Sequence, residues 1–344
     1  MKKFSLSVWV IASVLAAGAV DLVSAPRADA SLLLALLFWA AVAQGILALS
    51  AAADLSGAGW IKVIQPQIQA FYPVLFLFPF LFLVYARHVT VYSWVQQPTA
   101  WLNPTFFMAR NFLMLLLPPL CALFYVRAGA RQSRRRGLGA VLYLAAFVIS
   151  QSFMAFDLLM TFDYPWVNTL FGGYFFVEAM YAGIAFMAII TGIRRRQDAG
   201  RYGPAFRDFV QMLMGFALLW AGLFFSQYLV TWYGNIPEEV SFLARRLADP
   251  GLNALGVFVL VSLFVIPFLL LISRKIKSSF AAVLPIALLV LSGLLAERLF
   301  FLIPVAPLSP LLAVLYLAIL SLPFVFTGPW GKIKCRKMGK MILY

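Results

Sequence analysis

The sequence is poor in the residues that usually hold metals and redox groups. It has one histidine, His88, and two cysteines, Cys121 and Cys335, which form no CxxC pair. A haem with two axial histidines needs a second histidine, and iron–sulfur and structural zinc sites need several clustered ligands. Two cysteines so far apart in the chain indicate no disulfide framework either. We therefore expect a chain that binds no metal and no redox cofactor of its own.

Acidic residues are scarce as well. The chain has 12 Asp and Glu against 27 Lys and Arg, which gives a net charge of +15. The basic residues lie in short clusters between apolar segments rather than along one surface. That distribution is typical of the loops that orient membrane proteins. The charge pattern therefore argues against a nucleic-acid partner and for contact with a lipid bilayer.

Apolar runs make up most of the remaining sequence. Hydrophobic residues are 64% of the chain, and the mean hydropathy is +0.94. The runs are about 20 residues long, which is enough to cross a bilayer core as helices, and the short alternating segments of a membrane barrel do not occur. We predict an all-α polytopic membrane protein with ten transmembrane helices, at residues 4–22, 31–52, 70–86, 104–127, 137–158, 169–191, 206–230, 252–273, 279–302 and 307–327.

The positions of the basic residues predict the orientation of these spans. With a cytoplasmic N-terminus, 21 of the 27 Lys and Arg residues fall on the cytoplasmic side, as the positive-inside rule expects. The even number of spans then places the C-terminus on the same side. The first segment, MKK followed by an apolar run and PRADA-S, also resembles a signal peptide with a cleavage site after Ala30. We expect it to be retained as a span, because its apolar run is long for a signal sequence.

A weak repeat suggests how the spans are grouped. Leu102-Asn103 and Leu252-Asn253 lie 150 residues apart, and each pair opens a span that ends in a basic cluster. A shift of four spans keeps the membrane direction, so the repeat is parallel. It predicts two four-helix bundles, spans two to five and six to nine, with two peripheral helices. The division is a first span or signal-like segment at 1–30, bundles at 31–158 and 169–302, and a last span with a basic tail at 307–344.

Glu178 is the most unusual polar residue of the predicted spans. Tyr174, Glu178 and Tyr181 follow the spacing of one helix face. Glu178 lies nine residues after the predicted start of its span at Thr169, about 13–14 Å into the membrane. A carboxyl group there is expensive unless it is paired or protonated. Glu178 between two phenols is therefore a candidate proton relay.

The preceding span has a matching polar stripe. Tyr143, Ser150 and Asp157 are spaced by seven residues on one face. We expect spans five and six to be antiparallel neighbours whose polar faces meet and lead from the membrane interior to the outer surface. The hypothesis is a proton path, and the alternative is interhelical hydrogen bonding without transport.

Six further polar residues are notable in the sequence. Glu297 and Arg298 are adjacent, so we expect them to pair with different partners, and Glu297 is a further candidate for the proton path. We expect Arg110 to form a structural ion pair, with Asp157 or Glu297 as its partner. We predict His88 and Asp163 near the outer surface, where both are candidates for a position close to quinone. The alternative is that His88 is only a solvated histidine and that Asp163 only shapes a turn. Asp21 is expected at the interface, exposed to water.

Three segments resemble the ActF-type membrane subunit of alternative complex III. MTFDYPWVNTLFGGYFF, residues 160–176, is similar to the family pattern MSLEPHWxSTxFGxYxF. WLNPTFFMARNF, residues 101–112, resembles LNxPFFxxR, and FFSQYLVTWYGNIPEE, residues 224–239, resembles FSQYxxxWYxNIPEE. This sequence departs from the family with Asp163 in place of Glu and Tyr164 in place of His, so no histidine-dependent quinol contact carries over.

The resemblance implies a place in a larger assembly. The family belongs to the NrfD/PsrC-like superfamily, with ten spans in two four-helix bundles. Its members are cofactor-free subunits of a quinol:electron acceptor oxidoreductase in the bacterial inner membrane, and they are proposed to contribute a proton route. The partners implied are an iron–sulfur and molybdopterin-like subunit, an NrfD-like sister subunit and c-type cytochromes, which carry the haems and iron–sulfur clusters. Quinol is the substrate of the whole complex.

Two other classes stay open from the sequence. A stand-alone proton-coupled secondary transporter would also have about ten spans and buried acids, and Pro118-Pro119, Pro267 and Pro285 would then mark broken helices. A purely structural membrane anchor would use the same polar stripes only for packing.

Overall fold

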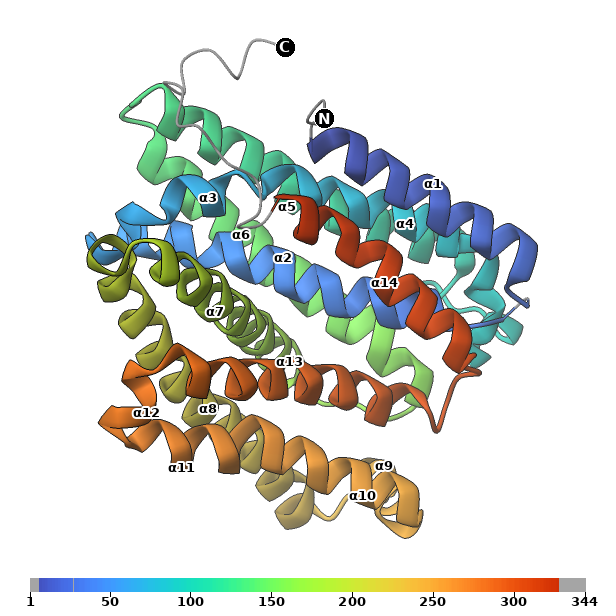
Figure 1. Ribbon diagram of the computed structural model, residues 1–344. Coiled ribbons are helices and arrows are strands. Elements are labelled where there is room, and N and C mark those ends of the chain that lie inside the picture. Colours follow the sequence, from blue (N-terminus) through green and yellow to red (C-terminus); the bar gives the residue numbers. More distant parts are fainter. Residues whose placement is uncertain (1–5, 27, 328–344) are drawn as a thin grey trace.

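The computed structural model describes residues 6–26 and 28–327, and within these ranges it is built from helices without strands (Figure 1). The basic tail expected after residue 327 and Cys335 lie outside the described residues. In chain order the elements are α1 Leu6–Ser24, α2 Ser31–Leu55, η1 Trp60–Val63, α3 Gln65–Gln69, η2 Tyr72–Phe76, α4 Leu77–Tyr85, η3 Ala86–Val91, η4 Ser93–Gln96, α5 Pro104–Ala130, α6 Arg136–Phe153, η5 Met154–Leu159, η6 Met160–Asp163, α7 Phe171–Gln197, α8 Ala199–Gly234, α9 Pro237–Ala248, α10 Pro250–Leu260, η7 Val261–Val265, α11 Ile266–Ile272, α12 Arg274–Ser278, α13 Phe280–Leu302 and α14 Pro310–Thr327.

The helices confirm an all-α polytopic membrane protein. In the described part of the chain, nine helical stretches are long and apolar enough to cross a membrane, and the helix at Pro310–Phe326 is shorter. The nine stretches are Leu6–Ser24, Ser31–Leu55, Gln65–Val91, Pro104–Ala130, Arg136–Asp163, Phe171–Gln197, Ala199–Gly234, Pro250–Ile272 and Phe280–Leu302. They correspond to the first nine predicted spans, and α14 corresponds to the tenth.

The third stretch is less regular than its apolar run predicts. It is divided into α3, η2, α4 and η3 rather than forming one helix. Pro66 and Pro73 lie in the first turns of α3 and η2. Proline has no backbone N–H and starts a helix more readily than it continues one, which accounts for the new start at each position.

The loops gather at two opposite ends of the bundle (Figure 1). We call one end the basic face; it contains residues 131–135, 194–198 and 273–279 and lies at the left of Figure 1. The other end is the aromatic face, which contains residues 86–103, 160–170 and 235–249 and lies at the right. Each transmembrane helix runs from one face to the other.

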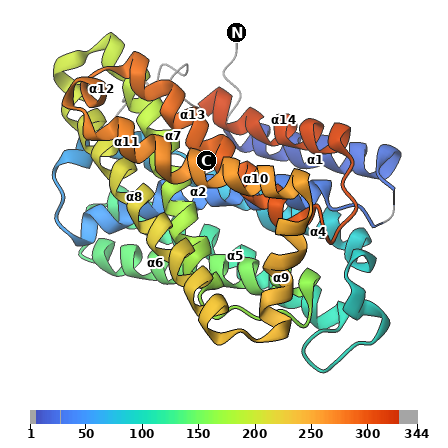
Figure 2. The same ribbon diagram turned by 90° about the horizontal axis from the view of Figure 1, so that it is seen from below.

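Helix α2 is the centre of the packing. Of its most apolar window, 94% is buried inside the protein, and it contacts α4, α6, α7 and α14. Figure 2 shows α2 near the middle, with α5 and α6 on one side and α13 and α14 on the other. Helix α1 packs against α14 and α4 at the edge. A helix that is apolar all round is expected in such an interior position.

Helices α2 and α7 touch through their backbones at two glycines. A Cβ atom on Gly45 would lie 1.8 Å from the carbonyl oxygen of Ala179, and one on Gly183 would lie 2.5 Å from the carbonyl carbon of Gly45. Small residues allow such close helix contacts in membranes. This crossing holds α7, which carries Glu178, against the central helix.

We expect Gly45→Ala to destabilise the protein by about 1–3 kcal/mol or more, because the added methyl group forces the two backbones apart. The measurement is thermal unfolding of the purified protein in detergent. Gly222→Ala in α8 is the matched control, since nothing lies within 4 Å of its added Cβ. Equal melting temperatures for the two variants would contradict the close crossing.

Candidate functional site

Four side chains of α7 and α13 form a buried group of charged and phenolic residues, which we call the Glu178 cluster. Nη2 of Arg298 donates a hydrogen bond to Oε2 of Glu178 over 2.5 Å. The hydroxyl of Tyr174 donates to Oε1 of Glu297, and the carboxyl groups of Glu178 and Glu297 also interact with each other. Glu178, Tyr174, Glu297 and Arg298 are each at most 3% exposed.

Helix geometry explains how two adjacent residues of α13 reach this group. Tyr174 and Glu178 are four residues apart, so they lie one above the other on one face of α7. Glu297 contacts the first and Arg298 contacts the second. The guanidinium of Arg298 also lies 3.8 Å from the centroid of the Phe175 ring, a favourable contact for a desolvated cation.

The cluster contains one more acid than base. With both carboxyl groups ionised and one guanidinium, its net charge would be −1 in surroundings where an uncompensated charge is costly. Three of its polar atoms have no hydrogen-bond partner in the protein: Glu178 Oε1, Glu297 Oε2 and Arg298 Nη1. One proton bound between the two carboxyl groups would remove the excess charge. The arrangement is therefore suited to taking up and releasing a proton.

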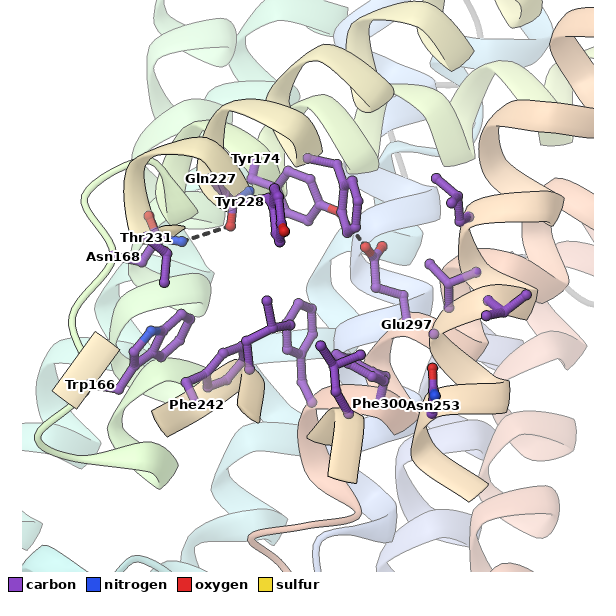
Figure 3. Close-up of a pocket in the computed structure, with 18 residues that line it drawn as sticks. Trp166, Asn168, Tyr174, Gln227, Tyr228, Thr231, Phe242, Asn253, Glu297 and Phe300 are labelled. Carbon is purple, nitrogen blue, oxygen red and sulfur yellow. Dashed lines mark hydrogen bonds between the residues drawn. The ribbon is translucent and has the colours of Figure 1, made fainter. Parts of the chain in front are cut away.

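A cavity lies beside this cluster, and its lining includes Trp166 and Asn168 from the aromatic face (Figure 3). It encloses about 240 Å³ between α8, α9, α10, α13 and the segment around Trp166 and Asn168. Glu297 and Tyr174 are among its lining residues. The free oxygen of Glu297 thus belongs to a group that borders open space rather than a closed core.

The position of Glu178 differs from the sequence-based expectation. Helix α7 begins at Phe171 and has 27 residues, so Glu178 lies about 10 Å from its first residue along an axis of about 40 Å. The carboxyl group therefore lies about halfway between the aromatic-face end of the helix and its middle. The prediction placed it deeper because it started the span two residues too early and made it too short.

Tyr174, Glu178 and Tyr181 lie on one face of α7 as expected, but neither phenol forms a hydrogen bond with Glu178. Tyr174 donates to Glu297 instead, and the hydroxyl of Tyr181 donates to the backbone carbonyl of Leu263 over 2.9 Å. The π-helical η7, Val261–Val265, explains the second contact, because such a turn leaves carbonyl groups outside the regular hydrogen-bond ladder. The partner of Glu178 is Arg298, which sequence spacing alone did not indicate.

The polar stripe of the fifth span faces α2 rather than α7. The hydroxyl of Tyr143 donates to the carbonyl of Gln44 over 2.9 Å, and the amide of Gln151 donates to Oε1 of Gln44 over 3.1 Å. The side chain of Gln44 also contacts Ser150, over 3.5 Å. The expected contact between this stripe and Glu178 was therefore wrong. Gln44 of the central helix α2 supplies the polar partners of Tyr143, Ser150 and Gln151 instead.

Asp157 lies on a different side of the same stretch and pairs with α5. Nε of Arg110 donates to Oδ2 of Asp157 over 2.6 Å, and the amide of Asn111 donates to the same oxygen over 3.0 Å. Asp157 belongs to the π-helical η5, Met154–Leu159, which shifts the helical register after Ser150. Of the two partners suggested for Arg110, the structure has Asp157.

His88 and Asp21 are both buried, in contrast to a solvated histidine and an exposed aspartate. The backbone N–H of Asp29 donates to Nδ1 of His88 over 3.2 Å, so Nε2 carries the proton and donates to Asp21 over 2.9 Å. Arg87 and the hydroxyl of Tyr316 also donate to Asp21. These bonds join α1 and α14 to η3, and they leave both ring nitrogens of His88 occupied.

Asp163 holds α9 to the rest of the protein instead of only shaping a turn. Its two oxygens accept hydrogen bonds from Arg245 over 3.0 Å and from Arg246 over 2.6 Å. Arg246 is fully buried and also donates to the carbonyls of Phe300 and Phe301 at the end of α13. Burial lowers the pKa of Arg246, and the Asp163 carboxylate opposes that shift, so the ion pair keeps α9 over the cavity.

Sequence reasoning missed one further polar group, at the basic face. Both oxygens of Asp54 accept hydrogen bonds from Arg136 over 2.8 Å, and the hydroxyl of Tyr125 donates to the same carboxyl group. Gln65 donates to it as well. Four different elements meet here, and no spacing within one helix would have identified the group.

The comparisons with known proteins give no family for this chain. No protein-family model matches the sequence, and no curated protein matches it either. In the described residues, no three His, Cys, Asp or Glu side chains gather into a group that would hold a metal ion. The structure is that of a multi-pass membrane protein with a buried cluster of acidic residues beside a cavity.

Proposed function

We propose that the chain is a membrane subunit of a quinol-oxidising respiratory complex, in which it anchors the redox subunits and conducts protons. The observation that carries the proton role is the Glu178 cluster: two carboxyl groups against one guanidinium, beside a cavity that leads toward the aromatic face. Buried ionisable residues in membrane proteins commonly mark proton pathways. Three polar atoms of the cluster have no hydrogen-bond partner among the protein's own groups.

The aromatic face is the surface proposed to hold the redox subunits. The three segments that resemble the ActF-type family, residues 101–112, 160–176 and 224–239, all reach this face. Asn168 donates to Gln227 across two of them over 2.7 Å, and the third has Trp101 exposed. Trp232 and Tyr233 are 65% and 84% exposed in the same region. Exposed aromatic side chains are enriched at protein interfaces as well as at membrane surfaces.

The orientation in this proposal follows the charge distribution. The basic face faces the cytoplasm of a bacterium, as the positive-inside rule expects. The redox subunits, with an iron–sulfur and molybdopterin-like protein and c-type cytochromes among them, dock on the opposite side. The haems and clusters belong to those partners, and this chain supplies the membrane anchor and the proton-binding group.

The test is purification of the chain from its native membrane in a mild detergent. We expect a complex that contains haem, absorbs as reduced c-type cytochrome after addition of a short-chain quinol, and transfers electrons to an added acceptor. A stand-alone transporter would instead purify alone and move protons with a solute. Purification of the chain without haem-containing partners, under conditions that keep known respiratory complexes intact, would contradict the proposal.

A further inference from the structure

The cavity beside the Glu178 cluster is bordered by a buried acid with an unused oxygen. Oε2 of Glu297 has no hydrogen-bond partner in the protein although the residue is only 3% exposed, and Figure 3 shows its carboxyl group at the edge of the cavity. Among the described residues that line the cavity, Glu297 is the one charged side chain. A free carboxyl oxygen beside open space favours a cation that can donate a hydrogen bond.

Aromatic rings form much of the remaining wall. Trp166 stacks on Phe242 with ring centroids 3.8 Å apart, and Phe300, Phe301 and Tyr228 also line the cavity. The faces of such rings attract ammonium groups, most strongly where water is excluded. Since the described lining residues include no lysine or arginine, an ammonium group would meet no like charge in the wall. The wall and the acid thus favour the same kind of ligand.

Hydrogen-bond donors lie on another side of the cavity. Oε1 of Gln227 accepts a hydrogen bond from Asn168 over 2.7 Å, which fixes the amide, and Nε2 of Gln227 has no partner. Thr231 and Asn253 also line the cavity, and their side chains can donate as well. A ligand with an ammonium group at one end and acceptor oxygens at the other would satisfy both sides. The cavity therefore suits a short zwitterion.

The rim of the cavity indicates where the ligand comes from. Tyr228, Leu247 and Val257 line it and are 45–56% exposed, and they belong to α8, α9 and α10 on the outer side of the bundle near the aromatic face. Glu297 lies five residues before the end of α13 at Leu302, about 7–8 Å along the helix axis. The cavity is thus close to the headgroup layer that borders the hydrocarbon core, and its apolar rim opens toward lipid.

We propose that the cavity binds the headgroup of phosphatidylethanolamine, with its ammonium group donating to Oε2 of Glu297 and a phosphate oxygen accepting from Nε2 of Gln227. The volume of about 240 Å³ is below the roughly 300–1,000 Å³ of drug-sized ligand sites, so the headgroup enters and the acyl chains stay outside along the apolar rim. A choline headgroup has no N–H and would leave the Glu297 oxygen without a donor.

This lipid site is independent of the proposed respiratory function, because it uses only the cavity and the surrounding bilayer. It is also compatible with the proton role of the Glu178 cluster. The phosphoethanolamine group as a whole is neutral, so its binding leaves one excess acid in the cluster and a reason to bind one proton.

The test is native mass spectrometry of the full chain, purified in detergent and titrated with phosphatidylethanolamine, phosphatidylcholine or phosphatidylglycerol of identical acyl chains. We expect phosphatidylethanolamine to bind about tenfold more tightly than the other two, the usual effect of one hydrogen bond to a charged group. Glu297→Gln removes the charge, and Leu260→Trp fills the cavity from α10. Each should abolish the preference among the three lipids.

Each variant has a matched control that should keep the preference. Glu238→Gln removes an exposed carboxyl group of α9. Leu269→Trp adds the same ring at a residue that is 59% exposed on the same transmembrane stretch as Leu260 and does not line the cavity. Elution as a single species shows that each variant is folded.

Equal dissociation constants for phosphatidylethanolamine and phosphatidylcholine in the unmodified protein would overturn the inference. A preference that persists in Glu297→Gln or in Leu260→Trp would also overturn it, since the lipid would then bind elsewhere on the surface. Displacement of the lipid by water-soluble phosphoethanolamine as effectively as by a short-chain phosphatidylethanolamine would refute a lipid as the source of the headgroup.

Discussion

Glutamine at position 297 is expected to lower the number of protons moved per electron while the protein stays folded. The substitution leaves the Glu178–Arg298 ion pair intact and keeps an oxygen that can accept the hydrogen bond from Tyr174. It removes the second carboxyl group, so the remaining Glu178–Arg298 pair is neutral without an additional proton. The measurement is the proton-to-electron ratio of the assembled complex in closed vesicles during oxidation of a short-chain quinol.

The control for this substitution is Glu238→Gln. Glu238 is exposed in the first turn of α9, outside the transmembrane stretches, and its loss should leave the ratio unchanged. An unchanged ratio in Glu297→Gln, with normal electron transfer, would remove the proton role and leave a structural anchor. The structure makes Glu297 a sharper target than Glu178, because substitution of Glu178 also breaks the ion pair.

Removal of Arg298 should have the largest effect on stability. Arg298→Gln leaves the carboxyl groups of Glu178 and Glu297 without a cation in a buried site, and loss of one partner of a buried ion pair costs about 3–5 kcal/mol. The same substitution of both partners, Glu178→Gln with Arg298→Gln, should recover part of this loss, because only the Glu297 carboxyl group is then left without a cation and one bound proton neutralises it. Thermal unfolding in detergent measures both variants.

Arg274→Gln provides the matched arginine control. Arg274 is exposed on the basic face, and surface charges contribute little to stability, about 0–1 kcal/mol. If Arg298→Gln unfolds at the same temperature as Arg274→Gln, the ion pair does not hold α7 to α13. If the double variant is less stable than Arg298→Gln alone, the uncompensated charge is not the cause of the loss.

The fold was predictable because apolar runs of about 20 residues determine transmembrane helices almost by themselves. The ends of the spans were less certain, as the third stretch shows: prolines at positions 66 and 73 divide it into short helices. The π-helical turns at 154–159 and 261–265 leave no comparable mark in the composition. They nevertheless change which side Asp157 faces and which carbonyl Tyr181 meets.

The site was only partly predictable. Glu178, Tyr174 and Glu297 stand out in the sequence because charges and phenols are unusual inside apolar runs. Their partners come from other helices, so helix periodicity cannot identify them. Arg298 and Glu178 are 120 residues apart, and Gln44, which meets the stripe of the fifth span, is about as far from it. Such contacts depend on how the helices pack, which a single sequence does not specify.

The central claim is that the Glu178 cluster binds an exchangeable proton between its two carboxyl groups. Infrared difference spectroscopy of the purified protein, recorded between acidic and alkaline buffers, tests it directly through the C=O stretch of a protonated carboxyl group. The account predicts such a band in the unmodified protein, shifted in deuterium oxide, and its absence in Glu297→Gln. A spectrum in which the unmodified protein and Glu297→Gln show the same carboxyl bands would contradict it.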